Sequence, residues 1–459
     1  MRGLLSLFII LSSGPMVFAQ DKGKAEFSPS AEYRVRYWWT QNPGADGNDK
    51  GAESKAVHRF KIGTLYRANE RFTAGLTLLH NATWGLDDGA ANVGEKSDVT
   101  DPDNLLLVNE AYANWMTSED FNIRFGRQAY QIADGYVIGT NDWTEQPYSF
   151  EGVLATYESE VGRFQGFIFK LRDMGEGNGA ASASKDPEHN AYGLNFDLKA
   201  KPEWVKAVNF HIIKDSADAI EGGLGATVNG TQGQEAIRYG LMSAASLAMF
   251  DGKVWFASHT GKNKLVDANT KAKSEREANG MMFQAEVSTS IQSIMDSRIF
   301  VQYHYDSGDS VTSDDKDETY DPYLFERHDN AGLMDLVDWG NLTYLTFGWN
   351  GKLSDKTEAG ALYTMFSRTE TKASAAGPNP GINGGNLDFN PSTTYTSGDQ
   401  KIGDELDVWV EHKYEGGLST MARLGYFTPG EVIKNMVTTS GAVHDDNIIQ
   451  LMLQGKMTF

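Results

Sequence analysis

The carboxy-terminal end of the chain alternates between apolar and polar positions. Counted back from the last residue, the apolar or small positions are Phe459, Met457, Gly455, Leu453, Leu451 and Ile449. The positions between them are Thr458, Lys456, Gln454, Met452 and Gln450. Successive side chains of a strand point to opposite faces, so this pattern predicts a strand with one apolar face and one largely polar face.

Segments with the same two-residue period recur along the chain and predict about eighteen strands. Their expected spans are 29–40, 55–68, 71–84, 105–117, 121–130, 150–158, 162–172, 189–200, 205–214, 236–250, 253–261, 278–291, 297–306, 341–352, 357–370, 405–414, 418–427 and 446–459. Long connections alternate strictly with tight turns. The tight turns are expected at Asn69-Glu70, Ser118–Asp120, Ser159–Val161, Pro202–Trp204, Asp251-Gly252, Gln292–Asp296, Ser354-Asp355 and Glu415–Gly417.

Each strand is expected to have one apolar and one charged face. In segment 29–40 the two sets are Tyr33, Val35, Tyr37 and Trp39 against Glu32, Arg34 and Arg36. In segment 405–414 they are Leu406, Val408 and Val410 against Asp407 and Glu411. Tryptophans near strand ends are typical of the aromatic belts of membrane proteins, although Trp is also a core residue of soluble folds. Those near strand ends here are Trp39, Trp84, Trp115, Trp204 and Trp349.

Tight turns at one end and long loops at the other are the organisation of outer-membrane β-barrels. An even number of strands puts both chain ends on the periplasmic side, and closure leaves no unpaired strand edge in the bilayer. We therefore predict an all-β fold, a transmembrane antiparallel barrel with short periplasmic turns and long extracellular loops. The mean hydropathy of −0.44 is compatible with this fold, because lipid-facing residues alternate with polar lumen residues. A soluble fold whose edge strand ends in Phe459 is the alternative.

Residues 1–19 have the pattern of a secretory signal peptide, with a basic start, a short apolar run and small residues before the expected cleavage site. Residues 20–459 are then expected to form a single barrel domain in the outer membrane of a Gram-negative bacterium. The chain has no cysteine, which excludes disulfides and thiolate metal sites. The terminal strand resembles the closing strand of outer-membrane barrels, so we expect the barrel assembly machinery as a partner through Phe459.

The net charge of −21 is concentrated in the long connections, which hold about three acidic residues for every basic one. A field of this sign at one rim attracts cations and repels anions. Charged strand residues are expected to line a water-filled lumen, because contact with lipid is costly for them. The expected pore-lining residues are Glu32, Arg34, Arg36, Arg59, Lys61, Glu110, Arg124, Arg238, Glu286, Arg298, Arg368, Asp407, Glu411 and Arg423. The alternative is that these charges pair with one another inside a plugged barrel.

The long connection 307–340 is the most acidic of all. Clustered carboxylates are ligands for hard cations, so Ca²⁺ or Mg²⁺ is a candidate cofactor here, although the spacing does not match a helix-flanked calcium loop. The candidate ligands are Asp314, Asp315, Asp317, Glu318 and Asp321. Two alternatives stay open: a plain solvated loop, and a segment that folds into the lumen.

A series of motifs lies between residues 55 and 173, namely Asn109-Glu110-Ala111-Tyr112, Phe125-Gly126-Arg127-Gln128, Asp142-Trp143 and Ser149-Phe150-Glu151-Gly152-Val153. In this order and spacing the motifs resemble the pattern of the alginate-export family of outer-membrane channels. The resemblance implies an eighteen-stranded monomeric channel with Glu110, Arg127 and Glu151 near the lumen, and a trimer is the alternative. Two departures make alginate itself a poor substrate: Tyr148 stands where family members often have Arg, and the rim is acidic. Arg127 is also out of phase with inward-facing Arg124.

Three functions are compatible with these features. The first is a porin-like channel for passive diffusion of ions and small hydrophilic solutes, with a rim that favours cations. The second is a dedicated saccharide or polysaccharide channel, for which inward aromatic residues would form a rail. The third is a surface barrel that adheres or stabilises the envelope without transport, in contact with outer-membrane lipid and lipopolysaccharide. We expect no enzyme, because the histidines are scattered and no catalytic or zinc motif is present. The acidity excludes nucleic-acid partners.

Overall fold

The structure is a computed structural model. It describes residues 25–43, 51–84, 106–173, 188–217, 233–266, 273–311, 314–326, 328, 331–337, 339–371, 398–435 and 445–459. The expected signal peptide, residues 1–19, lies outside these ranges.

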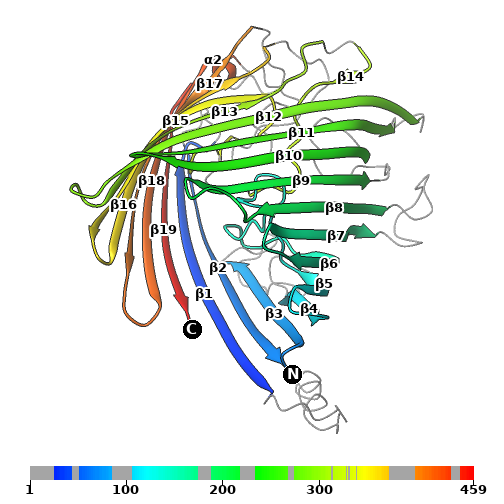
Figure 1. Cartoon of the computed structure of the whole chain (residues 1–459). Coiled ribbons are helices and arrows are strands. Elements are labelled where there is room, and N and C mark those ends of the chain that lie inside the picture. The colour runs from blue at the N-terminus through cyan, green and yellow to red at the C-terminus, as the bar shows by residue number, and fades with distance from the viewer. Residues whose placement is uncertain are drawn as a thin grey trace, which may run out of the picture.

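Within the described residues, eighteen antiparallel strands form the wall of one closed barrel (Figure 1). In chain order they are β1 (Glu26–Gln41), β2 (Ala52–Arg67), β3 (Phe72–Thr83), β4 (Leu106–Met116), β5 (Phe121–Gln128), β6 (Phe150–Glu158), β7 (Gly162–Asp173), β8 (Glu188–Leu198), β9 (Val205–Ala217), β10 (Gly233–Leu247), β11 (Phe250–Val266), β12 (Lys273–Ile291), β13 (Ser297–Asp306), β15 (Leu342–Ser354), β16 (Thr357–Arg368), β17 (Lys401–Lys413), β18 (Leu418–Pro429) and β19 (Ile448–Thr458). Two short elements add to the wall: β14 (Lys316–Asp317), which pairs in parallel with β12, and α2 (Glu431–Lys434).

Closure of the barrel depends on the pairing of the first strand with the last one. β1 and β19 are antiparallel over ten residue pairs, from Gln41↔Ile449 to Glu32↔Thr458. In Figure 1 the red β19 accordingly lies beside the blue β1. Every wall strand is therefore paired on both sides in the described part of the chain, and the backbone polar groups are satisfied within the wall.

The predicted strands are confirmed, and most of their ends agree within a few residues. One predicted turn is wrong. Asp251-Gly252 lies inside β11, and the turn is made by Ala248 and Met249, since Leu247 pairs directly with Phe250. Ala248 adopts a left-handed conformation with φ of 57°. An Asp-Gly dipeptide is a strong hairpin signal, but here cross-strand pairing outweighs it and an alanine takes the strained position.

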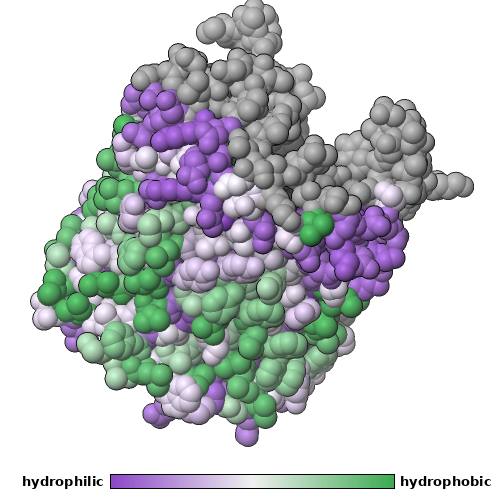
Figure 2. Space-filling model, turned by 90° about the horizontal axis from the view of Figure 1, so that it is seen from above, coloured by the Kyte–Doolittle hydropathy of each residue, from purple (hydrophilic) through white to green (hydrophobic). Residues whose placement is uncertain are grey.

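The two faces of the wall are as the alternation predicts. On β17, Leu406 and Val408 are exposed on the outside, whereas Asp407 between them is fully buried inside. On β1, Tyr33 is exposed and its neighbour Arg34 is buried. Three of the five tryptophans named above are exposed at strand ends, namely Trp84, Trp115 and Trp204. The outer surface is thus a broad apolar band, seen in green in Figure 2.

The apolar core lies inside the barrel and comes largely from two loop segments. We call residues 129–149, between β5 and β6, the first inward segment, and the described residues of 318–341, between β13 and β15, the second inward segment. Their buried apolar side chains pack on inward-facing wall residues such as Trp255 and Phe366. The side chains from the two segments include Tyr130, Ile132, Tyr136, Val137, Ile138, Tyr320, Phe325, Met334, Leu336 and Trp339.

The two inward segments also bind each other through their backbones. Ile138 and Leu324 form an isolated parallel bridge. The Leu324 N–H donates to the Val137 carbonyl at 3.0 Å, and the Gly139 N–H donates to the Leu324 carbonyl at 2.7 Å. Together the segments make a plug that narrows the lumen.

Candidate channel and its constriction

Three arginines on β1 and β2 hold the first inward segment against the wall. The Arg34 guanidinium donates to the carbonyl oxygens of Asp142, Trp143 and Thr144, at 3.1, 2.9 and 2.8 Å. Arg59 donates to the carbonyls of Asp142 and Thr144 at 2.7 and 2.8 Å. These arginines and Arg36 are at most 3% exposed. The charge of Arg34 and Arg59 is therefore covered by loop carbonyls and is not presented to the lumen.

Carboxylates complete this group of contacts. Glu145 accepts from Arg34 at 3.0 Å and from Arg36 at 3.2 Å. Asp142 contacts Arg59 and Lys61. Burial on its own raises the pKa of the Asp142 carboxyl, but these two cations outweigh burial and hold the pKa below its usual range. The Asp-Trp motif thus places one anion where two bases converge.

Trp143 lies between a guanidinium and an imidazole. The His328 ring is parallel to it, with ring centroids 3.6 Å apart and an interplanar angle of 3°. The Arg36 guanidinium carbon is 3.5 Å from the Trp143 ring centroid. Stacked and cation–π contacts of this kind hold a ring rigidly in place. The stack joins the wall, the first inward segment and the second inward segment at one point.

The partners of His328 define its tautomer. Its Nε2 is 3.1 Å from Nη1 of Arg423, which can only donate, so Nε2 is the acceptor. Its Nδ1 is 2.8 Å from an Asp335 carboxylate oxygen and therefore bears the proton. His328 is accordingly a neutral ring held between a cation and an anion.

Further wall residues hold the second inward segment. Arg238 donates to the Asp321 carboxylate and carbonyl, both at 2.7 Å. The Tyr323 hydroxyl donates to Asp215 at 2.9 Å. Glu405 accepts the backbone N–H groups of Leu333 and Met334 at 2.7 and 3.0 Å. The buried lumen charges thus position the plug.

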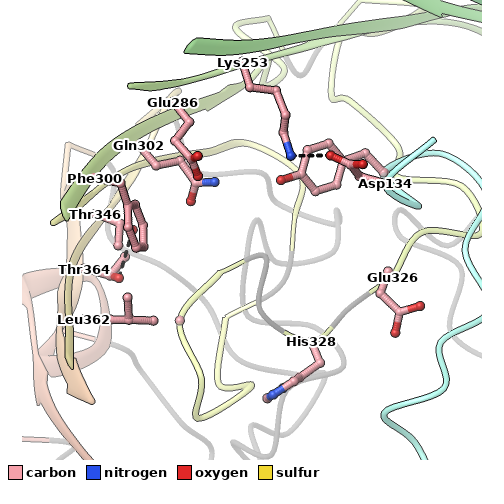
Figure 3. A pocket seen from close by; sticks show the side chains of 12 residues that line it. Asp134, Lys253, Glu286, Phe300, Gln302, Glu326, His328, Thr346, Leu362 and Thr364 are labelled. Carbon is pink, nitrogen blue, oxygen red and sulfur yellow. Dashed lines mark hydrogen bonds and ion pairs between the residues drawn. The ribbon is translucent and has the colours of Figure 1, made fainter. Parts of the chain in front are cut away.

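The described residues line two cavities beside the plug. The larger, about 670 Å³, lies at the long-loop end, and the smaller, about 330 Å³, lies toward the short-turn end (Figure 3). Charged residues that line the long-loop cavity are Arg36, Glu53, Lys55, Glu145 and Asp335. Those that line the short-turn cavity are Asp134, Lys253, Glu286 and Glu326. His328 lines both cavities and therefore marks the constriction between them.

Figure 3 shows how the short-turn cavity is built. Glu286 comes from the wall, and Glu326 and His328 come from the second inward segment. Lys253 on β11 reaches Asp134 of the first inward segment and forms an ion pair with it. Burial raises the pKa of the Glu326 carboxyl above its usual range, against the effect of the Asn141 N–H, which it accepts at 2.6 Å.

The predicted pore-lining residues fall into three groups. Arg36 lines the long-loop cavity and Glu286 the short-turn cavity, where Arg298 forms an ion pair with Glu286. A second group faces inward but is covered by protein, namely Arg34, Arg59, Arg238, Arg368, Asp407 and Arg423. The rest also face inward, as partly exposed side chains in local contacts: Glu32, Lys61, Glu110, Arg124 and Glu411.

Arg127 and Glu151 do not lie near the lumen, contrary to what the family resemblance implies. They share the outward face with Phe125 and Val153, which are 46% and 43% exposed. Their side chains form an ion pair of 3.1 Å on the outer surface. Gly126, with φ of 116°, does not shift the register, because Arg127 stays paired with Ala111 and with Glu151. The two-residue period of the strands therefore places both Arg127 and Glu151 on the outward face.

The candidate metal ligands do not converge. Asp321 binds Arg238, Asp317 accepts from Asn263 at 3.1 Å, and Glu318 accepts from Ser310 at 3.1 Å. Among the described residues, no three carboxylate or histidine side chains come together as a metal site would require. Binding of Ca²⁺ or Mg²⁺ at 307–340 stays a prediction.

Several residues at the constriction were not predicted from strand parity. Trp143, His328, Asp335 and Glu326 all lie in loops, where no period assigns a face. One signal was available, because both loops contain apolar runs that a solvated loop would not need. These runs are Tyr136-Val137-Ile138 and Leu333-Met334-Asp335-Leu336-Val337.

Comparisons with known proteins agree on the fold. Residues 27–443 match the sequence profile for alginate export. OccK9 (OpdG) of Pseudomonas aeruginosa is 12% identical with a TM-score of 0.57, and the match covers 95% of this chain and 99% of that one. OccAB2 of Acinetobacter baumannii is 12% identical with a TM-score of 0.56, covering 94% and 98%. The outer membrane protein OpdK of Pseudomonas aeruginosa is 11% identical with a TM-score of 0.56, again covering 94% and 98%. No curated protein sequence matches this chain.

Proposed function

The chain belongs to the alginate export family, and on that premise we propose that it is a narrow channel for ions and small hydrophilic solutes that favours cations. The family and the similar solved structures establish a channel-type porin fold in the outer membrane of a Gram-negative bacterium. The solute class, the charge preference and the absence of catalysis are our proposal.

The charge of the cavity lining is the observation that carries this proposal. The short-turn cavity is lined by three acids and one base, and the long-loop cavity by three acids and two bases, with His328 left out of both counts. The wall is rich in arginine, but loop carbonyls and carboxylates cover most of those guanidinium groups. Rings of carboxylates in a narrow aqueous path favour cations. The accessible path is thus acidic even though the wall behind it is basic.

The plug supports a narrow path. Eighteen strands alone would leave a wide aqueous lumen. The two inward segments fill much of it, and the cavities meet at His328 beside the Trp143 ring. Ions and small polar molecules fit such a path better than an extended polyanion, which would meet the lining carboxylates.

A saccharide pathway is the second candidate, and one specific observation favours it. The long-loop cavity is lined by Trp38 and Trp143, whose ring centroids are 6.3 Å apart in an edge-to-face arrangement. The two faces of Trp143 are covered by Arg36 and His328 at the constriction. Trp38 is therefore the ring left to contact a sugar, which would bind in the long-loop cavity before the constriction.

Single-channel recording of the refolded protein in a salt gradient tests the proposal. We expect small open steps and a reversal potential of the sign that marks cation preference. An anion-selective reversal potential would contradict the charge preference. Block by micromolar neutral oligosaccharide would favour the saccharide pathway, and a protein that inserts without conducting would favour a barrel with no transport role.

A further inference from the structure

The outer surface of β5 to β12 has a row of charged side chains near the long-loop end. All of them lie on the outward face of their strands, and neighbouring strands contribute opposite charges. We call this set the outer charged belt; its members are Arg127, Glu151, Lys170, Glu188, Lys214, Glu235, Lys262, Lys264, Glu275 and Glu277.

Ion pairs connect the belt from strand to strand. Arg127 is 3.1 Å from Glu151, and Lys170 is 3.1 Å from Glu188. Lys262 is 2.7 Å from Glu275. Most of these side chains are between 37% and 65% exposed, so they reach solvent or a neighbouring molecule.

Glu235 has two basic neighbours in the belt. Lys214 is 3.5 Å from it and Lys264 is 3.8 Å from it. An ammonium group has three donors, and a contact with one carboxylate leaves donors free for an additional anion. Lys214, Lys264 and Glu235 together therefore have a net positive charge, within a belt whose bases and acids are equal in number.

The belt begins where the apolar surface ends. On five of the eight belt strands, β5, β6, β7, β9 and β10, the outward side chain two residues along from a belt residue is apolar, whereas on β8, β11 and β12 it is Asn190, Thr260 and Asn279. These apolar residues are Phe125, Val153, Ile168, Ile212 and Ile237, which are 46%, 43%, 57%, 39% and 45% exposed. Figure 2 shows hydrophilic side chains gathered along the border of the hydrophobic surface. This border is the level at which lipid headgroups meet a membrane barrel.

The rest of the circumference differs. On β18, β19, β1 and β2, the outward side chains at the same end are Tyr426, Ile449, Trp39 and Ala56. The described residues on that side include one comparable pair, Lys401 and Asp404. The belt is thus a property of one side of the barrel and not of strand ends in general.

We propose that the outer charged belt binds the phosphate groups of the outer-leaflet glycolipid. The basic residues lie at headgroup depth, and lysines near a membrane surface attract anionic headgroups by direct Coulomb interaction. The belt carboxylates orient the lysines and reduce repulsion among them. The lipid-facing surface is therefore two-sided, with phosphate-rich lipid along β5 to β12 and apolar or aromatic contact along the opposite side.

The experiment measures lipid bound to the detergent-purified full-length protein by native mass spectrometry. The probes are diphosphoryl lipid A and the same lipid without its phosphates. The belt variant combines Lys170→Gln, Lys214→Gln and Lys264→Gln. The matched control combines Lys199→Gln, Lys352→Gln and Lys356→Gln, which are ion-paired lysines at the short-turn end.

We expect the belt variant to bind diphosphoryl lipid A roughly tenfold more weakly than the unaltered protein, and the control to bind it normally. The dephosphorylated lipid should bind both variants equally. Equal binding of diphosphoryl lipid A by the belt variant and the unaltered protein would overturn the proposal, and so would an equal loss in the control. Equal binding by the belt variant would mean that the belt residues are ordinary solvated side chains at strand ends.

If the belt variant folds poorly, the salt dependence of lipid binding to the unaltered protein still tests the proposal. Binding of diphosphoryl lipid A to the unaltered protein should weaken steadily as salt rises, because exposed charges are screened. Binding that is insensitive to salt would contradict the proposal. Conductance is a separate measurement, so failure of this inference would leave the proposed channel function untouched.

Discussion

Arg59 and Arg298 show that an inward position on a strand does not define what a charged side chain does. Both face the inside of the barrel with the predicted parity. Arg59 is fully buried and donates to loop carbonyls. The Arg298 side chain is 36% exposed and pairs with Glu286 at the edge of the short-turn cavity. The difference comes from which loop folds over each residue.

Arg298→Gln is expected to move the reversal potential further toward cations. The substitution removes a positive charge beside the short-turn cavity and leaves Glu286 without its cation. The measurement is the reversal potential of single channels in a salt gradient. Arg163→Gln is the control, because Arg163 is an exposed residue paired with Glu158 at the short-turn end. An unchanged potential would remove Arg298 from the conduction path.

Burial raises the pKa of Glu326 above 4.5, the ordinary pKa of a glutamate side chain. On acidification, the cation preference is therefore expected to begin to decline at a pH above 4.5. As pH falls through a raised pKa, the carboxylate takes up a proton and the short-turn cavity loses one negative charge. The measurement is the reversal potential as a function of pH. Glu326→Gln should abolish this part of the pH dependence, and an identical pH profile in that variant would count against the assignment.

At the scale of elements, the two inward segments are held by contacts that are distant in sequence. Arg34 and Arg59 reach residues 142–145 across a separation of more than eighty positions. The Tyr136 ring packs at a tilt of 59° against both Trp255 and Trp339, with ring centroids 4.7 and 5.3 Å apart. Each loop therefore depends on the wall and on the other loop.

Arg59→Met is expected to loosen the first inward segment and enlarge the conductance. The substitution removes one of the two arginine donors to the Asp142 and Thr144 carbonyls and leaves Lys456 as the remaining basic partner of Glu32. Breaking a buried charge pair costs about 3–5 kcal/mol. The measurements are single-channel conductance and the free energy of unfolding in denaturant. Arg163→Met should cost about 0–1 kcal/mol, because that ion pair is exposed. A change of selectivity at unaltered conductance would show that Arg59 lines the path instead.

At the scale of the whole molecule, closure makes the barrel a single cooperative unit. β1 and β19 are the two ends of the chain, and their ten residue pairs remove both free edges at once. The seam ends with the Phe459 N–H, which donates to the Ala31 carbonyl at 2.9 Å. The Phe459 side chain itself is 70% exposed and adds little to the folded barrel.

Phe459→Ala is expected to reduce assembly in cells while leaving the folded protein about as stable as before. The side chain is available to the assembly machinery, and the backbone bonds of the seam do not need it. The measurements are the amount of protein in the outer membrane and the unfolding free energy of the refolded variant. Leu453→Ala in β19 is a comparison that alters an outward side chain of the same strand. Normal membrane levels of Phe459→Ala would contradict the expectation.

The strands and their two faces could be predicted from the sequence because they depend on local information. Two-residue alternation, as in Leu406-Asp407-Val408, decides which side of the wall a side chain faces, and this holds even for Arg127, where the family resemblance implied otherwise. The turn at Ala248 escaped prediction, since register with the neighbouring strand outweighed the local Asp-Gly signal.

The sequence by itself determined the closed wall, its apolar exterior and the inward placement of most of its charged residues, because a side-chain period needs no partner to be defined. Only the tertiary structure decided which of those charges line a path and which hold a plug. The two inward segments have no period, and the positions of their described residues depend on contacts such as Trp143 with His328 that exist only once distant strands have closed around them.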